Sequence, residues 1–290
     1  AGVDCSDNEV NIKIALGAEV ARGALTMPNR DKLLASMTND VGALVLEDNR
    51  LQTLALSIAE RGGAAALPLL TRLIEIFEAE GRLDRAVEGL ASNDELLRRA
   101  QSGQGLTRPE LAVLLATAKL WLQDAIEGVD TSGDVILAAG INAAFPPAMQ
   151  KNHAQAIATH QLRSQIIATK LANRMVNRMG LIHPLELAEE EGVTLGEVAL
   201  AFVAAEALHG APAIWKSIEN ADVEESARLM LFDQLAIELR VQMADLLRNG
   251  WTGMKPSEVV AALVPGMKRV SAEVDALLLG ETRRHNEGFA

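Results

Sequence analysis

The chain has 290 residues, a formal net charge of −12 and a hydrophobic content of 49%, a balance that is typical of a folded globular protein. The acidic charge excludes general nucleic-acid binding, which needs a basic surface, and the single cysteine, Cys5, excludes an intrachain disulfide and favours a cytoplasmic protein. The longest uncharged run, residues 135–150, is interrupted by glycine and by two prolines, so the sequence predicts no membrane-spanning segment.

Residues 1–16 predict a turn that is followed by a short helix. Gly2 and Val3 suit the end of a strand or a turn, and residues 6–9 (Ser-Asp-Asn-Glu) form a capping-box pattern. Apolar residues then recur as far as Leu16. A strand-to-helix turn with free backbone amides is where α/β enzymes place ligands. Capping alone also explains Ser6, so the residues by themselves leave both interpretations open.

The next segments predict helices that are separated by glycine. A short helix is expected over residues 30–37 and a longer one from about residue 38 to residue 58, before Gly62 and Gly63. Residues 64–79 are amphipathic, with one apolar side formed by Leu70, Leu73, Ile74 and Phe77. Residues 83–99 predict a weaker helical pair, broken around residues 91–93.

Two more capping boxes begin strong helices. Residues 107–110 (Thr-Arg-Pro-Glu) precede a helix through residue 126, and residues 194–197 (Thr-Leu-Gly-Glu) precede one over 198–208. Further helices are expected over 184–191, around 214–215, over 223–248 and over 256–279, with a kink or break at Pro265 and a frayed tail over 281–290. No segment after Leu16 alternates convincingly and aromatic residues are only 3%, so the fold class expected is all-α, an irregular multi-helix bundle.

Residues 151–179 predict one long helix, enclosed by other helices, around which the rest is organised. It follows two prolines and reaches Gly180 without an internal glycine or proline. Its apolar positions cover most of the circumference, except for a basic stripe formed by Arg163, Lys170, Arg174 and Arg178. Two interpretations of this stripe stay open: pairing with acidic side chains of neighbouring helices, or a docking surface for an anion or an acidic partner.

Motifs for cofactor or metal chemistry are absent from the sequence. There is no phosphate-binding glycine loop and no metal-binding cysteine or histidine pattern, and His153 and His160 lie two helical turns apart, too far to share one metal ion. The three tryptophans, Trp121, Trp215 and Trp251, are expected to anchor the core. We therefore predict no metal site in this chain.

Several segments resemble the large bacterial NAD-specific glutamate dehydrogenases. The opening (Ala-Gly-Val-Asp-Cys-Ser-Asp-Asn-Glu-Val-Asn-Ile-Lys) is similar to the segment that follows their nicotinamide-facing Asn, although Asn8 stands where the family usually has His. Residues 48–57 resemble the last helix of the family's catalytic domain. Residues 106–116 and 166–180 resemble two further segments of the family, in the same order and more than fifty residues apart.

The resemblance implies a domain boundary near Gly62. Residues 1–62 would be a stub, the C-terminal end of an α/β catalytic domain, and residues 63–290 an appended helical domain of structural, regulatory or oligomeric role. Ser6 would be a substrate-binding residue that contacts the side-chain carboxylate of glutamate. The catalytic lysine and aspartate and most of the NAD site would lie in preceding residues of a longer protein, so this piece alone is expected to be inactive. Its partners would be the missing catalytic domain and further copies of the chain, with no nucleic acid and no membrane.

A second hypothesis comes from a different functional class. A free-standing helical adaptor would bind an acidic partner through the basic stripe. An open reading frame that continues upstream into a dinucleotide-binding fold would exclude the adaptor.

Overall fold

The structure is a computed structural model that describes residues 2–277, with side chains described over residues 4–274. This part of the chain contains fifteen α-helices, one 3-10 helix and no strand, so the all-α prediction is confirmed. The first elements are α1 Gly2–Ala21, α2 Met27–Ser36, α3 Thr38–Arg61, η1 Gly63–Ala66, α4 Leu67–Ala79 and α5 Asn93–Gln101. They continue with α6 Arg108–Glu127, α7 Val135–Asn142, α8 Pro147–Asn152, α9 Ala154–Ala158 and α10 Arg163–Met179. The remaining elements are α11 His183–Glu191, α12 Leu195–His209, α13 Ala211–Asn220, α14 Glu225–Arg248 and α15 Pro256–Leu277.

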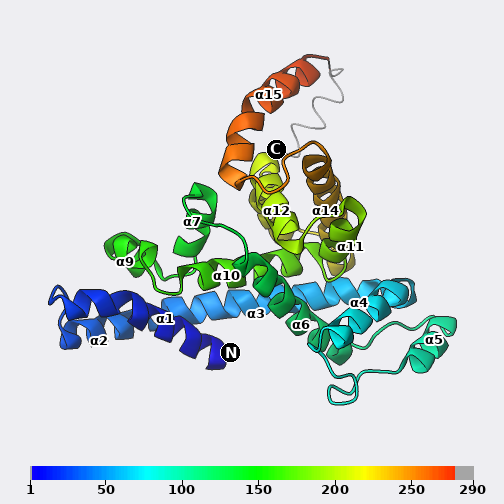
Figure 1. Cartoon of the computed structure of the whole chain (residues 1–290), viewed down its shortest axis with the longest axis horizontal. Helices are drawn as coiled ribbons and strands as arrows, with labels where there is room; N and C mark the ends of the chain where they lie inside the picture. The colour runs from blue at the N-terminus through cyan, green and yellow to red at the C-terminus, as the bar shows by residue number, and fades with distance from the viewer. Residues whose placement is uncertain (1, 278–290) are drawn as a thin grey trace.

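The helices form a lower row with a second group standing on it (Figure 1). The row has α1 and α2 at one end, α3 along its middle, and α4 and α5 at the other end. Above it stand α11, α12, α14 and α15, and α10 joins the two groups because it contacts α3, α6 and α7 as well as α12 and α14. The role of α10 as the organising element is therefore seen in its contacts.

The core is apolar and runs through both groups. Helix α12 is buried at every position from Val198 to Glu206, as expected of a helix that is apolar on all sides. Helix α4 buries the predicted face, with Phe77 edge-on to Trp121 at 5.4 Å between ring centroids. Trp215 is buried, and Trp121 and Trp251 are half-buried against the same core, so the core assignment of the tryptophans is confirmed.

The predicted long helix over residues 151–179 is wrong, because the segment is divided into α8, α9 and α10. His160 supplies the physical reason for the second break. The backbone amide of Leu162 donates to His160 Nδ1 at 3.0 Å, and His160 Nε2 donates to the backbone oxygen of Asn11 in α1 at 3.0 Å. A side chain that hydrogen-bonds backbone groups in this way competes with the continuous helix.

The N-terminal strand or turn and the Ser6 capping box are also wrong. Helix α1 already begins at Gly2, so Ser6 lies inside a helix. Asp4 in the first turn favours this helix start electrostatically, and Asn8 Nδ2 donates to the Asp4 backbone oxygen at 2.8 Å. Whether residues 1–62 are a stub of a catalytic domain stays a prediction.

Two smaller expectations differ from the structure. Residues 83–92 form turns, and only the second half of the expected helical pair, α5, is helical; Asp84 Oδ1 accepts from the amides of Ala86 and Val87, which favours a turn. Helix α15 is not broken at Pro265. The carbonyl of Ala261 that Pro265 leaves without a donor is on an exposed residue, where water can hydrate it. The tail over residues 281–290 lies outside the described residues.

Both later capping boxes are confirmed. The Thr107 amide and hydroxyl donate to the Glu110 carboxylate at 2.7 and 2.8 Å, and those of Thr194 donate to Glu197 at 2.7 and 2.8 Å. They start α6 and α12, two helices that contact α10 and also contact each other.

Candidate functional site

Ser6 is exposed on α1 and is not placed in a cavity. Its neighbours Asp7 and Asn8 line a cavity of about 390 Å³, with a mixed polar and apolar lining, together with Lys170 and Asn173 of α10. The structure thus brings the first turns of α1 close to one end of the basic stripe. A substrate-binding role for Ser6 stays a prediction.

The basic stripe on α10 meets acidic residues of three different helices. Lys170 Nζ lies 2.9 Å from Asp48 Oδ2, Arg174 Nη2 lies 2.9 Å from Glu206 Oε2, and Arg178 Nη2 lies 2.8 Å from Glu219 Oε1. Arg163, at the start of α10, forms no ion pair with the described part of the chain. Three of the four positions therefore follow the pairing interpretation, and docking through the stripe stays a prediction.

Arg178 is the most enclosed member of the stripe. Its guanidinium lies 4.8 Å from the centroid of the Trp215 ring and 5.7 Å from that of Phe232. Its partner Glu219 also forms an ion pair with Arg50 of α3, with Arg50 Nη2 3.0 Å from Glu219 Oε1. A cation between two aromatic rings and a carboxylate shared by two arginines make this a packed junction of α3, α10, α13 and α14.

Glu206 on α12 is a buried acid that the sequence analysis did not single out. It is only 4% exposed, its Oε1 has no hydrogen-bond partner, and its single ion pair is with Arg174. Burial raises the pKa of Glu206 to about 7, because the loss of hydration outweighs the attraction of Arg174 and Arg178. The signal in the sequence was a lone glutamate within a run of apolar residues.

Glu206→Gln is expected to flatten the pH dependence of stability. Since the pKa of Glu206 is about 7 in the folded chain and 4.5 in the unfolded chain, the folded chain holds a proton between these values that the unfolded chain has released. The free energy of unfolding should fall by about 3 kcal/mol as the pH rises across this interval, and glutamine removes that change. Urea unfolding at about pH 5 and about pH 8 measures it. Glu189→Gln, which alters a more exposed ion pair, is the control; equal slopes in all three proteins would contradict the assignment.

Lys119 on α6 is a half-buried ionisable group that the sequence analysis also missed. Burial lowers the pKa of Lys119 to about 8, against the attraction of Asp48 and Asp4, and Lys170 lowers it further. Two lysines and two aspartates thus gather where α1, α3, α6 and α10 meet. With two lysines and two aspartates, this group is close to charge balance.

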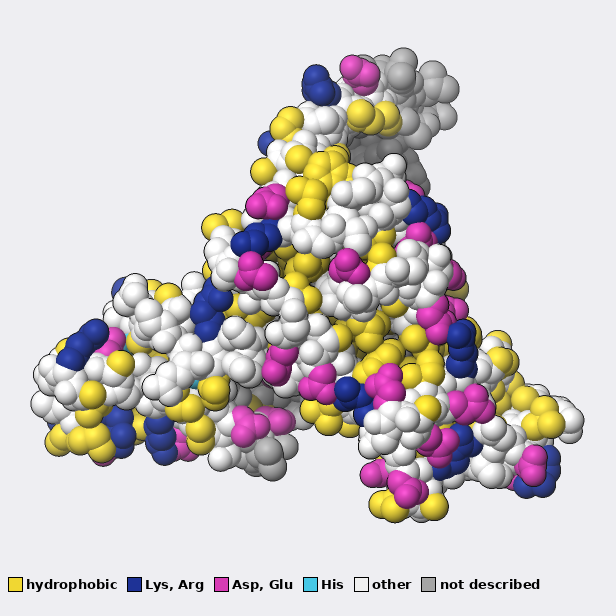
Figure 2. Space-filling view, in the orientation of Figure 1, with side chains coloured by type: hydrophobic (Ala, Val, Ile, Leu, Met, Phe, Trp, Pro, Cys, Tyr) yellow, Lys and Arg dark blue, Asp and Glu magenta, His cyan; other side chains and the backbone are white. Residues whose placement is uncertain are grey.

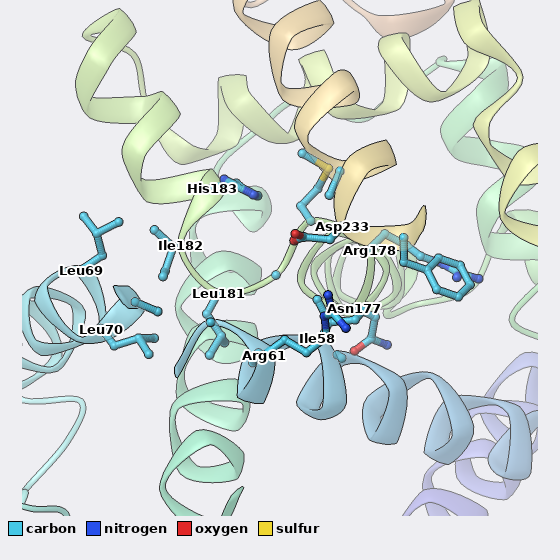
Figure 3. Close-up of a pocket in the computed structure, with 18 of the residues that line it drawn as sticks. Ile58, Arg61, Leu69, Leu70, Asn177, Arg178, Leu181, Ile182, His183 and Asp233 are labelled. Carbon is cyan, nitrogen blue, oxygen red and sulfur yellow. The ribbon is translucent and has the colours of Figure 1, made fainter. Parts of the chain in front are cut away.

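A largely apolar cavity of about 290 Å³ lies between the lower row and the upper group of helices (Figure 3). Its walls come from α3, α4, the turn between α10 and α11, and α14. Ile58, Leu69, Leu70 and Ile182 supply apolar surface, and the polar side chains at its margin include Arg61, Asn177, His183 and Asp233. Burial lowers the pKa of His183, so its imidazole is neutral at pH 7.

Metal and membrane sites are not found in the described residues. No group of three or more histidine, cysteine, aspartate or glutamate side chains is arranged to hold a metal ion there. Within the same residues, no single helix has the length and apolarity to cross a bilayer, and only the bent pair α11 and α12 meets that test when taken together.

Comparison with known proteins identifies two matching family models. Residues 103–289 match the model described as glutamate dehydrogenase, C-terminal, and residues 1–59 match the model of the bacterial NAD-glutamate dehydrogenase catalytic domain.

Three curated relatives are named NAD-specific glutamate dehydrogenase. The chain is 37% identical over 284 residues to the protein of Pseudomonas aeruginosa, and the aligned region covers 97% of this chain and 18% of the relative. It is 35% identical over 283 residues to that of Halomonas elongata, covering 97% and 17%, and 36% identical over 240 residues to that of Mycobacterium tuberculosis, covering 83% and 14%. The chain thus spans less than a fifth of the length of these relatives.

Proposed function

The chain belongs to the family of glutamate dehydrogenase C-terminal regions, and from this premise we propose that it is the helical end of an NAD-dependent enzyme that oxidises L-glutamate. In the full-length protein, glutamate, NAD⁺ and water would give 2-oxoglutarate, ammonia and NADH. Hydride transfer to NAD would take place in the larger, preceding part of the protein. The relatives' names and the match of residues 1–59 to a catalytic-domain model support this proposal.

We propose that the helical region stabilises the last helix of the catalytic part, and the environment of α3 carries this proposal. Helix α3 lies almost wholly within the residues that match the catalytic-domain model, yet it contacts α6, α10 and α14. Ala55 of α3 is buried in the main core, and Leu54 and Ile58 pack against the same core. A helix held in this way depends on the helical region for its position.

Polar contacts fix the register of α3 against its neighbours. Arg108, at the start of α6, donates to the Thr53 backbone oxygen at 3.1 Å and to Ser57 Oγ at 3.2 Å, and it also pairs with Glu60. Lys170 of α10 forms an ion pair with Asp48, which is nearer the N-terminus of α3. Since half-exposed ion pairs contribute little net stability, we assign the stabilisation to apolar burial and the alignment to these contacts.

The turn after α3 is pressed against the segment that precedes α6. A Cβ atom built on Gly105 would lie 2.7 Å from the backbone of Gly63, closer than real contacts permit, so only glycine fits at position 105. This close approach places the turn after α3 directly against the first residues of the C-terminal family match.

Helix α1 is held by the helical region as well. Glu19 Oε2 lies 2.8 Å from His153 Nδ1, and the Asn11 backbone oxygen accepts from His160. The helix that carries Ser6 is therefore joined to α8, α9 and α10 through two histidines. This arrangement supports a role for the helical region in placing the catalytic part.

Steady-state NADH formation tests the proposed activity. The full-length protein should reduce NAD⁺ when L-glutamate is added, and produce 2-oxoglutarate and ammonia in equal amounts. The 290-residue chain by itself should form no NADH. Failure of the full-length protein to oxidise glutamate would contradict the proposed reaction.

The adaptor hypothesis is not supported by a specific observation. Lys170, Arg174 and Arg178 already pair with acids of the same chain, which leaves little free positive charge on α10 for an acidic partner. A cytoplasmic location and self-association remain part of the proposal. Exposed apolar residues on α14 offer one surface for self-association: Met230, Leu231, Ile237 and Val241.

A further inference from the structure

His160 binds two backbone groups at once, in the connection between α9 and α10. Its Nδ1 accepts from the Leu162 amide at 3.0 Å, and its Nε2 donates to the Asn11 backbone oxygen of α1 at 3.0 Å. Since an amide only donates and a carbonyl oxygen only accepts, the two contacts select the neutral imidazole with its proton on Nε2. His160 is 5% exposed, and hardly any histidine surface is visible on the face shown in Figure 2. At this burial, loss of either contact leaves a polar group unpaired.

Apolar packing alone does not fix the position of α1 along its own axis. Ile12, Ala15 and Leu16 are buried in the core, but the attraction that holds them is non-directional. A slip of α1 by one residue moves its backbone by about 1.5 Å, which takes a 3.0 Å hydrogen bond outside the normal range of about 2.7–3.2 Å. The bond from His160 to Asn11 therefore fixes the register of α1 against α9 and α10.

A second contact with α1 lies farther from Ser6. Glu19 Oε2 is 2.8 Å from His153 Nδ1. Along a helix that rises about 1.5 Å per residue, Asn11 is about 7.5 Å from Ser6 and Glu19 is about 20 Å from it. Of the two contacts, the one made by His160 therefore acts more closely on the first turns of α1, which lie within the match to the catalytic-domain model.

We propose that His160 is a positioning residue for glutamate binding: through the Asn11 backbone it sets the register of α1, and with it the place of Ser6. His160 itself does not touch the substrate. The inference rests on the proposed glutamate oxidation and on the predicted role of Ser6. A misplacement of a binding group by about 1 Å weakens its contact with the substrate. Because the contact that weakens is made in the ground state as well, loss of register raises the KM for glutamate more than it lowers kcat.

Two substitutions of His160 separate its two contacts. The amide oxygen of asparagine stands as many bonds from Cβ as Nδ1 does, so His160→Asn keeps the acceptor for Leu162 and loses the donor to Asn11. The amide nitrogen of glutamine stands as many bonds from Cβ as Nε2 does, so His160→Gln keeps the donor and loses the acceptor. His209→Asn, which alters an exposed histidine whose partner is Gln242 of α14, is the control.

Hydrogen exchange of α1 and glutamate kinetics, both measured on the full-length protein, test the proposal. His160→Asn should speed the exchange of the Gly2–Ala21 amides and raise the KM for glutamate about fivefold, with kcat changed by less than about twofold. His160→Gln should keep both close to the parent values, because it retains the bond to α1. His209→Asn should change neither.

The two measurements separate this proposal from the proposed activity. Unchanged α1 exchange in His160→Asn, or equal effects of the asparagine and glutamine substitutions, would overturn the register role of His160 whether or not the protein oxidises glutamate. Faster exchange with an unchanged KM would overturn the link to the substrate. Absence of glutamate oxidation in the parent protein would contradict the proposed function, and the α1 exchange would still decide whether His160 sets the register.

Discussion

Replacing Asp134 with alanine is expected to lower the free energy of unfolding by about 4 kcal/mol. The side chain of Asp134 is fully buried just before α7, and its carboxylate accepts from three backbone amides. Oδ1 accepts from Ile136 and Leu137 at 2.9 Å each, and Oδ2 accepts from Ser257, in the first turn of α15, at 2.8 Å. Alanine leaves these three donors without their acceptor and separates α7 from α15.

The pH dependence of this contribution has a definite sign. Although burial opposes ionisation, the backbone hydrogen bonds from Leu137, Ser257 and Ile136 hold the pKa of Asp134 below its ordinary value. The stabilisation is therefore complete above about pH 4 and is lost as the pH falls through the lowered pKa. Urea unfolding near neutral pH measures the full effect. Asp130→Ala, which removes an exposed aspartate 3.5 Å from Lys255, is the control and should cost less than about 1 kcal/mol. Similar losses in the two variants would contradict the bridging role.

Arg178→Ala is expected to destabilise the chain by about 3 kcal/mol. The substitution removes the partner of Glu219 and opens the space between Trp215 and Phe232. The cost lies at the lower end for a broken buried pair, since Arg50 still binds Glu219 at 3.0 Å. Thermal and urea unfolding measure the loss.

Arg163→Ala provides the matched comparison on the same helix. Arg163 is half-exposed and has no ion pair in the part that the structure describes, so its removal should change stability by less than about 0.5 kcal/mol. If the stripe were a docking surface whose arginines are equivalent, the two substitutions would have equal effects on stability. That result would contradict the pairing account of Arg178.

Local sequence patterns predicted the helices that begin with a capping box or have one apolar face. The Thr107 and Thr194 boxes and the apolar face of α4 depend on neighbouring residues in the sequence, and all are found in the structure. The division of residues 151–179 was not predictable in this way. It depends on His160 meeting the backbone of Asn11, a contact across 149 positions of the chain.

The same difference explains the outcome at the candidate site. The basic stripe is visible from helical spacing alone, but its partners come from α3, α12 and α13, and no local pattern identifies which acids they are. Glu206 and Lys119 owe their shifted pKa values to burial, which depends on the packing of other helices. The cavity is formed by segments far apart in the sequence, so its composition appears only once the helices are packed.

Hydrogen exchange of the α3 amides in the full-length enzyme tests the central claim most directly. Arg108→Gln combined with Lys170→Gln removes the polar contacts that align α3, whereas Arg72→Gln removes an arginine that pairs with Glu189, away from α3. The account predicts that amides of Thr38–Arg61 exchange faster in the double variant, that glutamate oxidation falls in parallel, and that Arg72→Gln changes neither. Unchanged exchange in α3, or faster exchange with full activity, would show that the helical region does not hold the catalytic part through this helix.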